Sequence, residues 1–280
     1  MRATHCPCSE RRGPRLAARP PALLLGILVA TAAGCAPIEP RYPERPAADA
    51  APMPSPIQLQ ASLAARNAAL ASFQGQGRLE YEGPDGKVRS ANMVVVKAPD
   101  KVRIDFRSPF SLTYTVATDG SELVAYDRGE KVLYRGLPTP YNIGRYTRVP
   151  VTLETLALLV RGLPPSPSGP ARGTVRAEGA TWSWEIPLDT GGSLALSFDR
   201  ESLRPRQARL LDPAGHGFIA TFAEYADVGG LDAAHEIRAE LPDGGRVQLI
   251  YGVIWRDRTH SDNAFRLEPI AGVREVDMDE

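Results

Sequence analysis

The sequence lacks the short motifs by which common enzymes are recognised. It contains no G-x-S-x-G nucleophile elbow, no P-loop and no glycine-rich dinucleotide fingerprint. The histidines beyond the N-terminal region, His216, His235 and His260, fall on separate turns and strands, with neither an i, i+4 pair nor a cysteine partner. The residues therefore give little support to a zinc site. We expect no enzyme activity, no metal and no other cofactor.

Long hydrophobic runs are also missing. The apolar stretch from Ala22 to Ala33 has about 12 residues, whereas a helix that spans a membrane needs about 20. Five arginines precede this stretch, Leu23 to Val29 forms its apolar centre, and the small residues Ala32-Ala33-Gly34 end it. These are the three parts of a secretory signal. We therefore predict that residues 1–34 are an export signal that is removed.

Cysteine is scarce, and Cys6 and Cys8 would be lost with the signal. Cys35 then remains alone, and a lone cysteine in an oxidising compartment is a liability unless it has a use. Its position directly after the small residues resembles a bacterial lipobox, with Ala32 where leucine is commoner. The resemblance implies that Cys35 is acylated and that its acyl chains anchor the protein to a membrane. Because Ala36 is not aspartate, the sorting rule of well-studied enterobacteria implies the outer membrane, facing the periplasm. The alternative is an ordinary signal peptide followed by a chance cysteine.

The processed chain has no surplus of basic residues. Removal of the signal takes five arginines and one glutamate from 33 basic and 33 acidic residues, which leaves 28 and 32, a net charge of −4. No basic block remains, so nucleic acid is not an expected partner. Residues 35–56 follow the signal and contain seven prolines. We expect this segment to be an extended tether that carries the acylated cysteine.

The remaining residues, 57–280, show only two helical patterns. The first predicts a helix over 57–73, followed by Gly75 and Gly77. The apolar stripe of this helix consists of Leu59, Leu63, Leu70 and Phe73. The second pattern predicts a short helix over 153–160, with Thr152 as its N-cap. Two short helices provide little material for a helical core.

Almost everything else alternates between apolar and polar residues. The period of two is clear in KVRIDF, TWSWEIPL, SLALSFD and RVQLIYGVIW, and turn sequences such as GPDG, TDGS and LPDGG separate the runs. This spacing predicts roughly 11 or 12 strands in a meandering antiparallel sheet. We therefore predict one mainly β domain over 57–280: a curved antiparallel sheet, closed only part of the way to a barrel, with an apolar inner face and a helical lid.

Three segments resemble a known family. They are LASFQGQGRLEY, KAPDKVRIDF with the following SLTYTVATDGSELVAYDRGEKVLYRG, and VTLETLALLVRGLPP. Together they resemble the LolA/LolB-like lipoprotein carrier and acceptor superfamily, best over residues 57–165. The resemblance implies an incomplete β-barrel covered by helices, whose cavity holds the acyl chains of lipoproteins. A lipid anchor at Cys35 makes the chain resemble the LolB branch of the family, whose members are themselves lipoproteins. The resemblance implies that it accepts cargo from a periplasmic LolA-like carrier.

The resemblance also implies roles for two residues. Phe110 in RSPFS corresponds to the tip of a membrane-facing loop between the third and fourth strands, although the family usually has leucine there and Pro109 shortens the loop. Arg103 resembles an arginine that holds the lid closed. The alternatives are that Phe110 packs inward and that Arg103 is a solvated strand residue.

Binding an acyl chain requires apolar area rather than reactive groups. The candidate lipid-binding residues are Val94, Val96, Ile104, Phe106, Leu112, Tyr114, Val116, Leu123, Trp182, Trp184, Leu196 and Phe198. The candidate lid residues are Leu63, Leu70, Leu156 and Leu159. Ordinary core packing is the alternative for each of them, and Trp182 with Trp184 also leaves open the stacking of a sugar.

The sequence therefore favours an outer-membrane lipoprotein that binds acyl chains of lipoproteins or lipids for lipoprotein localisation. A structural or sensory lipoprotein, which uses the same fold for protein contacts, is the alternative. An open apolar interior would favour the first function, and a solid interior filled by aromatic side chains would favour the second.

Overall fold

A computed structural model describes residues 52–84, 86–107, 112–167 and 169–280, with the backbone alone at residue 112. The expected signal, Cys35, most of the tether, Phe110 and the side chain of Leu112 lie outside the described part. Residues Ala50–Glu280 form one compact unit. Among the described residues, no helix combines the length and apolarity needed to cross a membrane.

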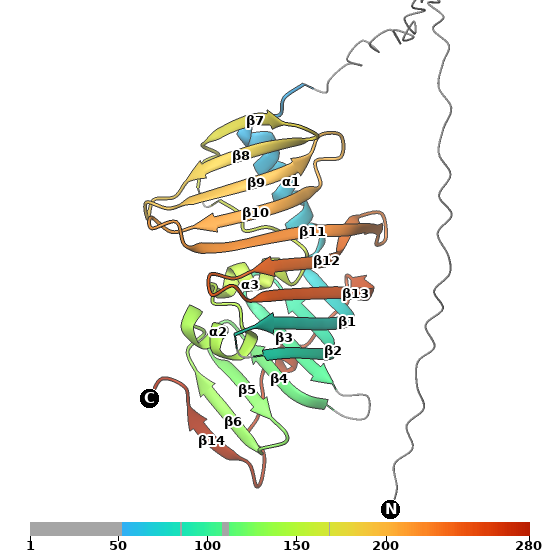
Figure 1. Cartoon of the computed structure of the whole chain (residues 1–280). Helices are drawn as coiled ribbons and strands as arrows, with labels where there is room; N and C mark the ends of the chain where they lie inside the picture. The colour runs from blue at the N-terminus through green and yellow to red at the C-terminus, as the bar shows by residue number, and fades with distance from the viewer. Residues whose placement is uncertain (1–51, 85, 108–111, 168) are drawn as a thin grey trace, which may run out of the picture. The chain divides into compact units, whose positions relative to one another are not determined.

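One unclosed 14-stranded sheet dominates this unit (Figure 1). Its order is β14-β6-β5-β4-β3-β2-β1-β13-β12-β11-β10-β9-β8-β7, so β14 and β7 are its free edges. The strands are β1 (Ser72–Gly83), β2 (Gly86–Lys97), β3 (Lys101–Arg107), β4 (Leu112–Thr118), β5 (Leu123–Asp127), β6 (Val132–Gly136), β7 (Thr174–Glu178), β8 (Thr181–Pro187), β9 (Ser193–Asp199), β10 (Pro205–Leu211), β11 (Gly217–Asp227), β12 (Asp232–Glu240), β13 (Arg246–Arg256) and β14 (Arg274–Asp277). The mainly β class and the curved, incompletely closed antiparallel sheet are confirmed, with more strands than the sequence predicted.

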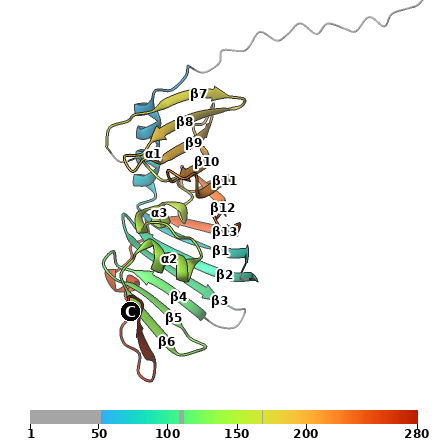
Figure 2. The same cartoon turned by 60° about the vertical axis from the view of Figure 1, so that its left-hand side comes forward.

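The helices lie on one face of the sheet, which we call the inner face. They are α1 (Pro56–Ala69), α2 (Pro140–Thr147) and α3 (Leu153–Leu159). Figures 1 and 2 place α1 along β7–β11, and α2 and α3 across the region of β1–β6, β12 and β13. Directly paired residues point to the same face, so the pairs Trp184–Leu196, Ala220–Ala239 and Ile104–Val116 all belong to the inner face.

The first helix ends earlier than the sequence predicted, at Ala69 rather than Phe73. Gly75 and Gly77, interpreted as residues that follow the helix, lie inside β1. They are needed there for space. A Cβ on Gly75 would lie 2.4 Å from the Tyr251 ring, and one on Gly77 would lie 1.9 Å from the Ile250 carbonyl oxygen. The two glycines therefore permit close packing against β13.

Helix α3 confirms the second helical prediction, and the Thr152 side chain caps it by accepting a hydrogen bond from the Thr155 N–H. Helix α2 was missed. It begins after Thr139, whose side chain accepts from the Asn142 N–H, and ends at Arg148 in the left-handed conformation (φ 66°). Its stability comes from these ends and from packing, because eight residues are too few to form a stable isolated helix.

A buried arginine joins two of the helices. Arg161, 1% exposed, donates from Nε to the Ala157 carbonyl (2.7 Å) and from Nη1 to Asn67 Oδ1 (2.8 Å) and the Leu70 carbonyl (3.2 Å). Burial lowers the pKa of Arg161 to about 10, so the guanidinium remains charged at neutral pH. Its partners lie at the C-terminal ends of α1 and α3, where the helix dipole favours a cation. Arg161 therefore fixes α1 to α3.

The outer face of β2–β6 has a cover of its own. The segment after β13 forms a short 3₁₀ helix, η1 (Asp262–Phe265), whose Phe265 is 1% exposed. Asp262 forms ion pairs with Lys97 (2.7 Å) and Lys101 (3.0 Å), and the Ala264 carbonyl accepts from Arg103 (3.0 Å). The chain then adds β14 parallel to β6. This part of the sheet is thus covered on both faces.

Candidate functional site

An open cleft lies on the inner face, between β1–β4 and α2. Its volume is about 410 Å³, within the range typical of ligand pockets. Half of its lining residues are apolar or aromatic, and the other half are hydroxyl-bearing residues and arginines. The lining residues are Leu79, Tyr81, Val88, Arg89, Ser90, Phe106, Arg107, Thr113, Tyr114, Tyr146, Thr147 and Arg148.

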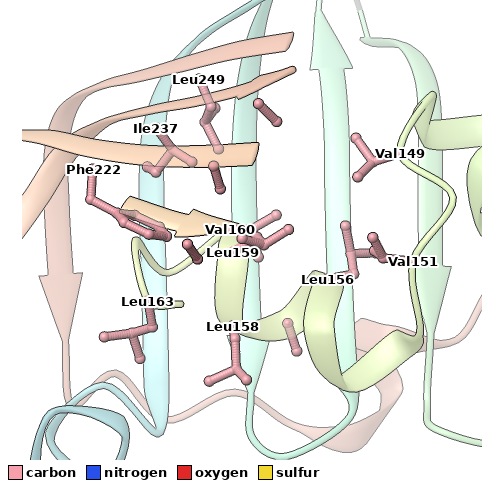
Figure 3. Packing of buried hydrophobic residues seen from close by; sticks show 14 of the residues in the cluster. Val149, Val151, Leu156, Leu158, Leu159, Val160, Leu163, Phe222, Ile237 and Leu249 are labelled. Atoms are coloured by element: carbon pink, nitrogen blue, oxygen red, sulfur yellow. The ribbon is translucent and has the colours of Figure 1, made fainter. Parts of the chain in front are cut away.

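A narrow cavity of about 50 Å³ adjoins this cleft, and the two share Leu79, Phe106 and Thr147. The other lining residues of the cavity are Ile104, Val149, Leu156, Leu159, Val160, Ile237, Ala239, Val247 and Leu249. Figure 3 shows Leu159 and Val160, at the end of α3, beside Ile237 and near Leu249. The hydroxyl of Thr147 donates to the Ile143 carbonyl (2.7 Å), within its own helix. The lining of the cavity is otherwise apolar.

Aromatic rings surround the cleft. Phe106 and Tyr114 lie with ring centroids 5.9 Å apart, and Tyr146 of α2 lies 5.3 Å from Tyr134 of β6. Burial raises the pKa of Tyr114 and of Tyr146, so both phenols are neutral in the physiological range. The buried hydroxyl of Tyr146 has no hydrogen-bond partner in the described protein. The wall of the cleft thus combines aromatic and apolar surface with polar and basic groups.

A row of alanines crosses the inner face and ends beside the cavity. Ala208, Ala220 and Ala239 pair in sequence across β10, β11 and β12, on the inner face. Ala239 pairs in turn with Val247, and these two residues line the cavity. Small side chains let a helix approach the sheet closely, while the neighbouring positions remain lined by branched aliphatic groups. The cavity lies where this row meets β13.

The structure brings part of the predicted site together. Ile104, Phe106, Leu156 and Leu159 line the narrow cavity, and Phe106 and Tyr114 line the cleft. Four further candidates are buried on the same face without reaching either space: Val94, Val96, Val116 and Leu123. We call the inner face of β1–β4, β12 and β13, together with α2 and α3, the hollow half.

The other predicted residues occupy what we call the filled half, the inner face of β7–β11 with α1. Trp182, Trp184, Leu196 and Phe198 are buried there in the common core, with Trp184 and Phe198 completely enclosed. The indole of Trp184 donates to the Arg172 carbonyl (2.9 Å). The candidate lid residues Leu63 and Leu70 belong to the buried side of α1 and its C-cap. None of these six residues lines the cleft or the narrow cavity.

Arg103, the candidate lid-holding residue, points to the outer face. Its guanidinium bonds Asp105 (Nε to Oδ1, 3.0 Å) and donates to the Ala264 carbonyl, so its described partners belong to β3 and the C-terminal segment. Arg103 therefore has no described contact with α1, α2 or α3, whereas the buried Arg161 contacts both α1 and α3.

Sequence reasoning missed several wall residues. The sequence placed Val247 and Leu249 on one apolar face of a strand. It did not show that a cavity would remain between this face and α3. Tyr146 and Thr147 were missed because α2 was missed. Their signal was a capping threonine followed by proline, Thr139-Pro140, too weak without an apolar stripe.

Two further features of the described residues concern metal binding and a second groove. No group of three His, Cys, Asp or Glu side chains there is placed to hold a metal ion. A second groove, of about 380 Å³, lies beside the N-terminus of α3 and is also mostly apolar; Val151, Leu188, Leu210 and Phe218 contribute to it. The cleft and narrow cavity form the stronger candidate, because they lead from solvent into the interior.

Solved structures share this fold. A LolA superfamily protein from Nitrosomonas europaea aligns with a TM-score of 0.52 and 14% identity over 74% of this chain and 97% of that one. A DUF1329 family protein from Desulfovibrio piger gives 0.54 and 13% over 76% and 98%. A domain from Vibrio parahaemolyticus described as an outer membrane lipoprotein-sorting protein gives 0.54 and 14% over 75% and 95%. No family model matches the sequence, and no curated protein matches it significantly. The resemblance seen in the sequence is confirmed at the level of structure: the chain has a LolA/LolB-like fold.

Proposed function

We propose that the protein binds acyl chains of lipoproteins or other lipids in the cleft and the narrow cavity, as an outer-membrane lipoprotein anchored through Cys35. The observation that carries the proposal is the open cleft together with the adjoining narrow cavity, which shares Leu79, Phe106 and Thr147 with it and is lined almost entirely by aliphatic groups. Each buried methylene contributes about 0.8 kcal/mol, so ten of them supply roughly 8 kcal/mol before the costs of ordering.

The shape and chemistry of the site suit a tail with a polar end. An apolar cavity rejects polar ligands because their groups would lose hydrogen bonds. The wider cleft offers hydroxyl, guanidinium and backbone groups at its rim for a head group or the first residues of a peptide. In this function the protein accepts cargo without chemical change, and its partners are acylated lipoproteins and a LolA-like periplasmic carrier.

A cavity-filling variant tests the proposal. Ala239→Phe places a ring in the narrow cavity and should weaken binding of a fluorescent fatty acid at least tenfold, while the protein stays folded. The measurement uses the full chain carrying Cys35→Ala, so that its own anchor cannot occupy the site. Ala177→Phe, on the exposed edge strand β7, adds the same ring away from the cavity and should leave binding unchanged. Absence of binding by the parent chain, or equal binding by the Ala239→Phe variant, would contradict this function.

The filled half favours a second candidate, a structural or sensory lipoprotein that binds protein partners. Its large aromatic side chains Trp184, Phe198 and Phe222 are buried in the core, and β7 and β14 present free edges to which another strand could pair. Deletion of the gene should then leave other lipoproteins correctly localised. Mislocalised lipoproteins in the deletion strain would favour the acyl-binding function.

A further inference from the structure

The groove beside the N-terminus of α3, which we call the α3 groove, is similar in size to the cleft. Its volume is about 380 Å³, against about 410 Å³ for the cleft, and both lie within the range of ligand pockets. The buried Val151, Phe218 and Leu241 contribute to its lining, together with the partly exposed Leu188 and Leu210. The α3 groove therefore offers a second apolar space that opens to solvent.

A narrow ridge separates the α3 groove from the cleft. The ridge is the connection between α2 and α3: Thr147 and Arg148 line the cleft, whereas Pro150 and Val151 line the groove. Helix α2 packs directly on this connection, because a Cβ on Gly144 would lie only 2.8 Å from Pro150 Cβ. The two residues from Arg148 to Pro150 span at most about 7 Å of chain. The two spaces thus border the same short segment.

The sheet also brings the two spaces together. Tyr81 of β1 lines the cleft, and Leu241, just after β12, lines the α3 groove. The turn that follows Leu241 leads into β13, where Val247 pairs directly with Tyr81. The buried Gly245 lies between the two linings: a Cβ there would be 3.4 Å from Leu241 Cδ1 and 3.4 Å from Tyr81 Cε2. The cleft and the α3 groove are therefore neighbours along the sheet as well as along the chain.

Two apolar spaces of similar size beside one ridge match a ligand with two hydrocarbon chains. When two chains are joined, binding of the second becomes an intramolecular event, which raises the affinity without any new contact in the first space. We propose that the α3 groove takes the second acyl chain of a ligand whose first chain occupies the cleft, so that the protein prefers two-chained to single-chained amphiphiles; this inference rests on the proposed acyl-binding function.

The ridge also indicates where the head group of such a ligand would lie. Chains that enter the two spaces from a common head group place that group over the ridge, to which Arg148 belongs. Arg148 is exposed, and its guanidinium lies 5.7 Å from the centre of the Tyr81 ring. A guanidinium forms strong, charge-assisted hydrogen bonds with phosphate oxygens. A phosphate-bearing head group therefore suits the probes that test the proposal.

Two lipids that share a head group and differ in the number of chains provide the test. Dioctanoyl phosphatidylglycerol and mono-octanoyl lysophosphatidylglycerol are titrated calorimetrically, as monomers, into the full chain carrying Cys35→Ala. We expect the two-chained lipid to bind as one molecule per protein and about tenfold more tightly than the single-chained lipid. Thr155→Trp places a ring at the α3 groove and should abolish this preference, while the single-chained lipid still binds in the cleft.

Thr174→Trp is the matched control. It adds the same ring at an exposed position of the edge strand β7, away from both spaces, and should keep the preference. Thr190→Trp, at another residue that lines the α3 groove, serves as a second variant if Thr155→Trp does not fold. Comparison of variants with the parent cancels the greater apolar area of the two-chained lipid, which is the same in each titration.

The possible results separate this inference from the function on which it rests. Equal affinities of the two lipids for the parent, or an equal effect of Thr155→Trp on both, would overturn the α3 groove as a second subsite and leave acyl binding in the cleft intact. A preference that survives Thr155→Trp and Thr190→Trp would likewise overturn it. Failure of both lipids to bind the parent would overturn the proposed function itself.

Discussion

The two halves of the sheet are built on the same alternating pattern but have different interiors. In the filled half, indole and phenyl rings from β8, β9 and β11 are buried in the common core. In the hollow half, the narrow cavity is lined mainly by valine, leucine, isoleucine and alanine, and it lies between α3 and strands β12 and β13. The comparison shows that alternation determines which face is buried, while side-chain volume determines whether the space closes.

The largest expected effect lies in the filled half. Trp184→Ala should reduce the free energy of unfolding by about 3–5 kcal/mol, because it removes a completely buried ring and leaves a void. Leu159→Ala, beside the existing cavity, should cost only about 2 kcal/mol, the low end for such substitutions. Urea denaturation of both variants measures the contrast. A smaller loss for Trp184→Ala than for Leu159→Ala would mean that the filled half is not tightly packed.

A smaller effect is expected where the halves are joined. Arg161→Met keeps the length of the side chain but removes the donors that pair with Asn67 and with the ends of α1 and α3. We expect a loss of about 2–3 kcal/mol, since buried carbonyls are left without partners. Arg209→Met, at an exposed position of β10, is the control and should change stability by less than about 0.5 kcal/mol.

The smallest effect concerns the outer cover of the hollow half, which is sensitive to pH. Hydrogen bonds from Lys97 and then Lys101 lower the pKa of Asp262 to about 2, from its ordinary value of 3.8. A lowered carboxyl pKa stabilises the folded state above the unfolded pKa, and the contribution is lost as the pH falls through the folded pKa. Asp262→Asn should therefore slightly lower the urea midpoint at pH 6, and the difference from the parent should shrink between pH 4 and pH 2. The control is Glu240→Gln, at an exposed position of β12, whose urea midpoint relative to the parent should not change in this way. If the difference between Asp262→Asn and the parent stayed constant from pH 6 to pH 2, the ion pairs of Asp262 would not be its cause.

Much of the fold could be predicted because period-two alternation is a local property of the sequence. It marked most of the strands from β1 to β13, although the helix boundary at Phe73 was wrong, since Phe73 is buried in either conformation. Strand β14 could not be predicted in this way, because four residues at a sheet edge are too short to show a period. Helix α2 depends on its caps and its neighbours, and neither produces an apolar stripe.

The candidate site could be predicted only in part, for a related reason. The pattern placed Ile104, Phe106, Trp182 and Trp184 on one apolar face, and the structure agrees that all four face inward. What covers each of them depends on pairings between distant segments, which local sequence does not encode. That these residues bind lipid stays a prediction.

The pairing of β1 with β13 has a consequence for how the molecule forms. These two strands lie side by side in the middle of the sheet although nearly the whole domain separates them along the chain. Contacts between residues that are distant in sequence slow folding, because the entropy of closing a long loop is lost before the contacts stabilise the chain. During synthesis, β1 must therefore wait with one edge unpaired until β13 emerges, and for that time the exposed edge can pair with a strand of another chain.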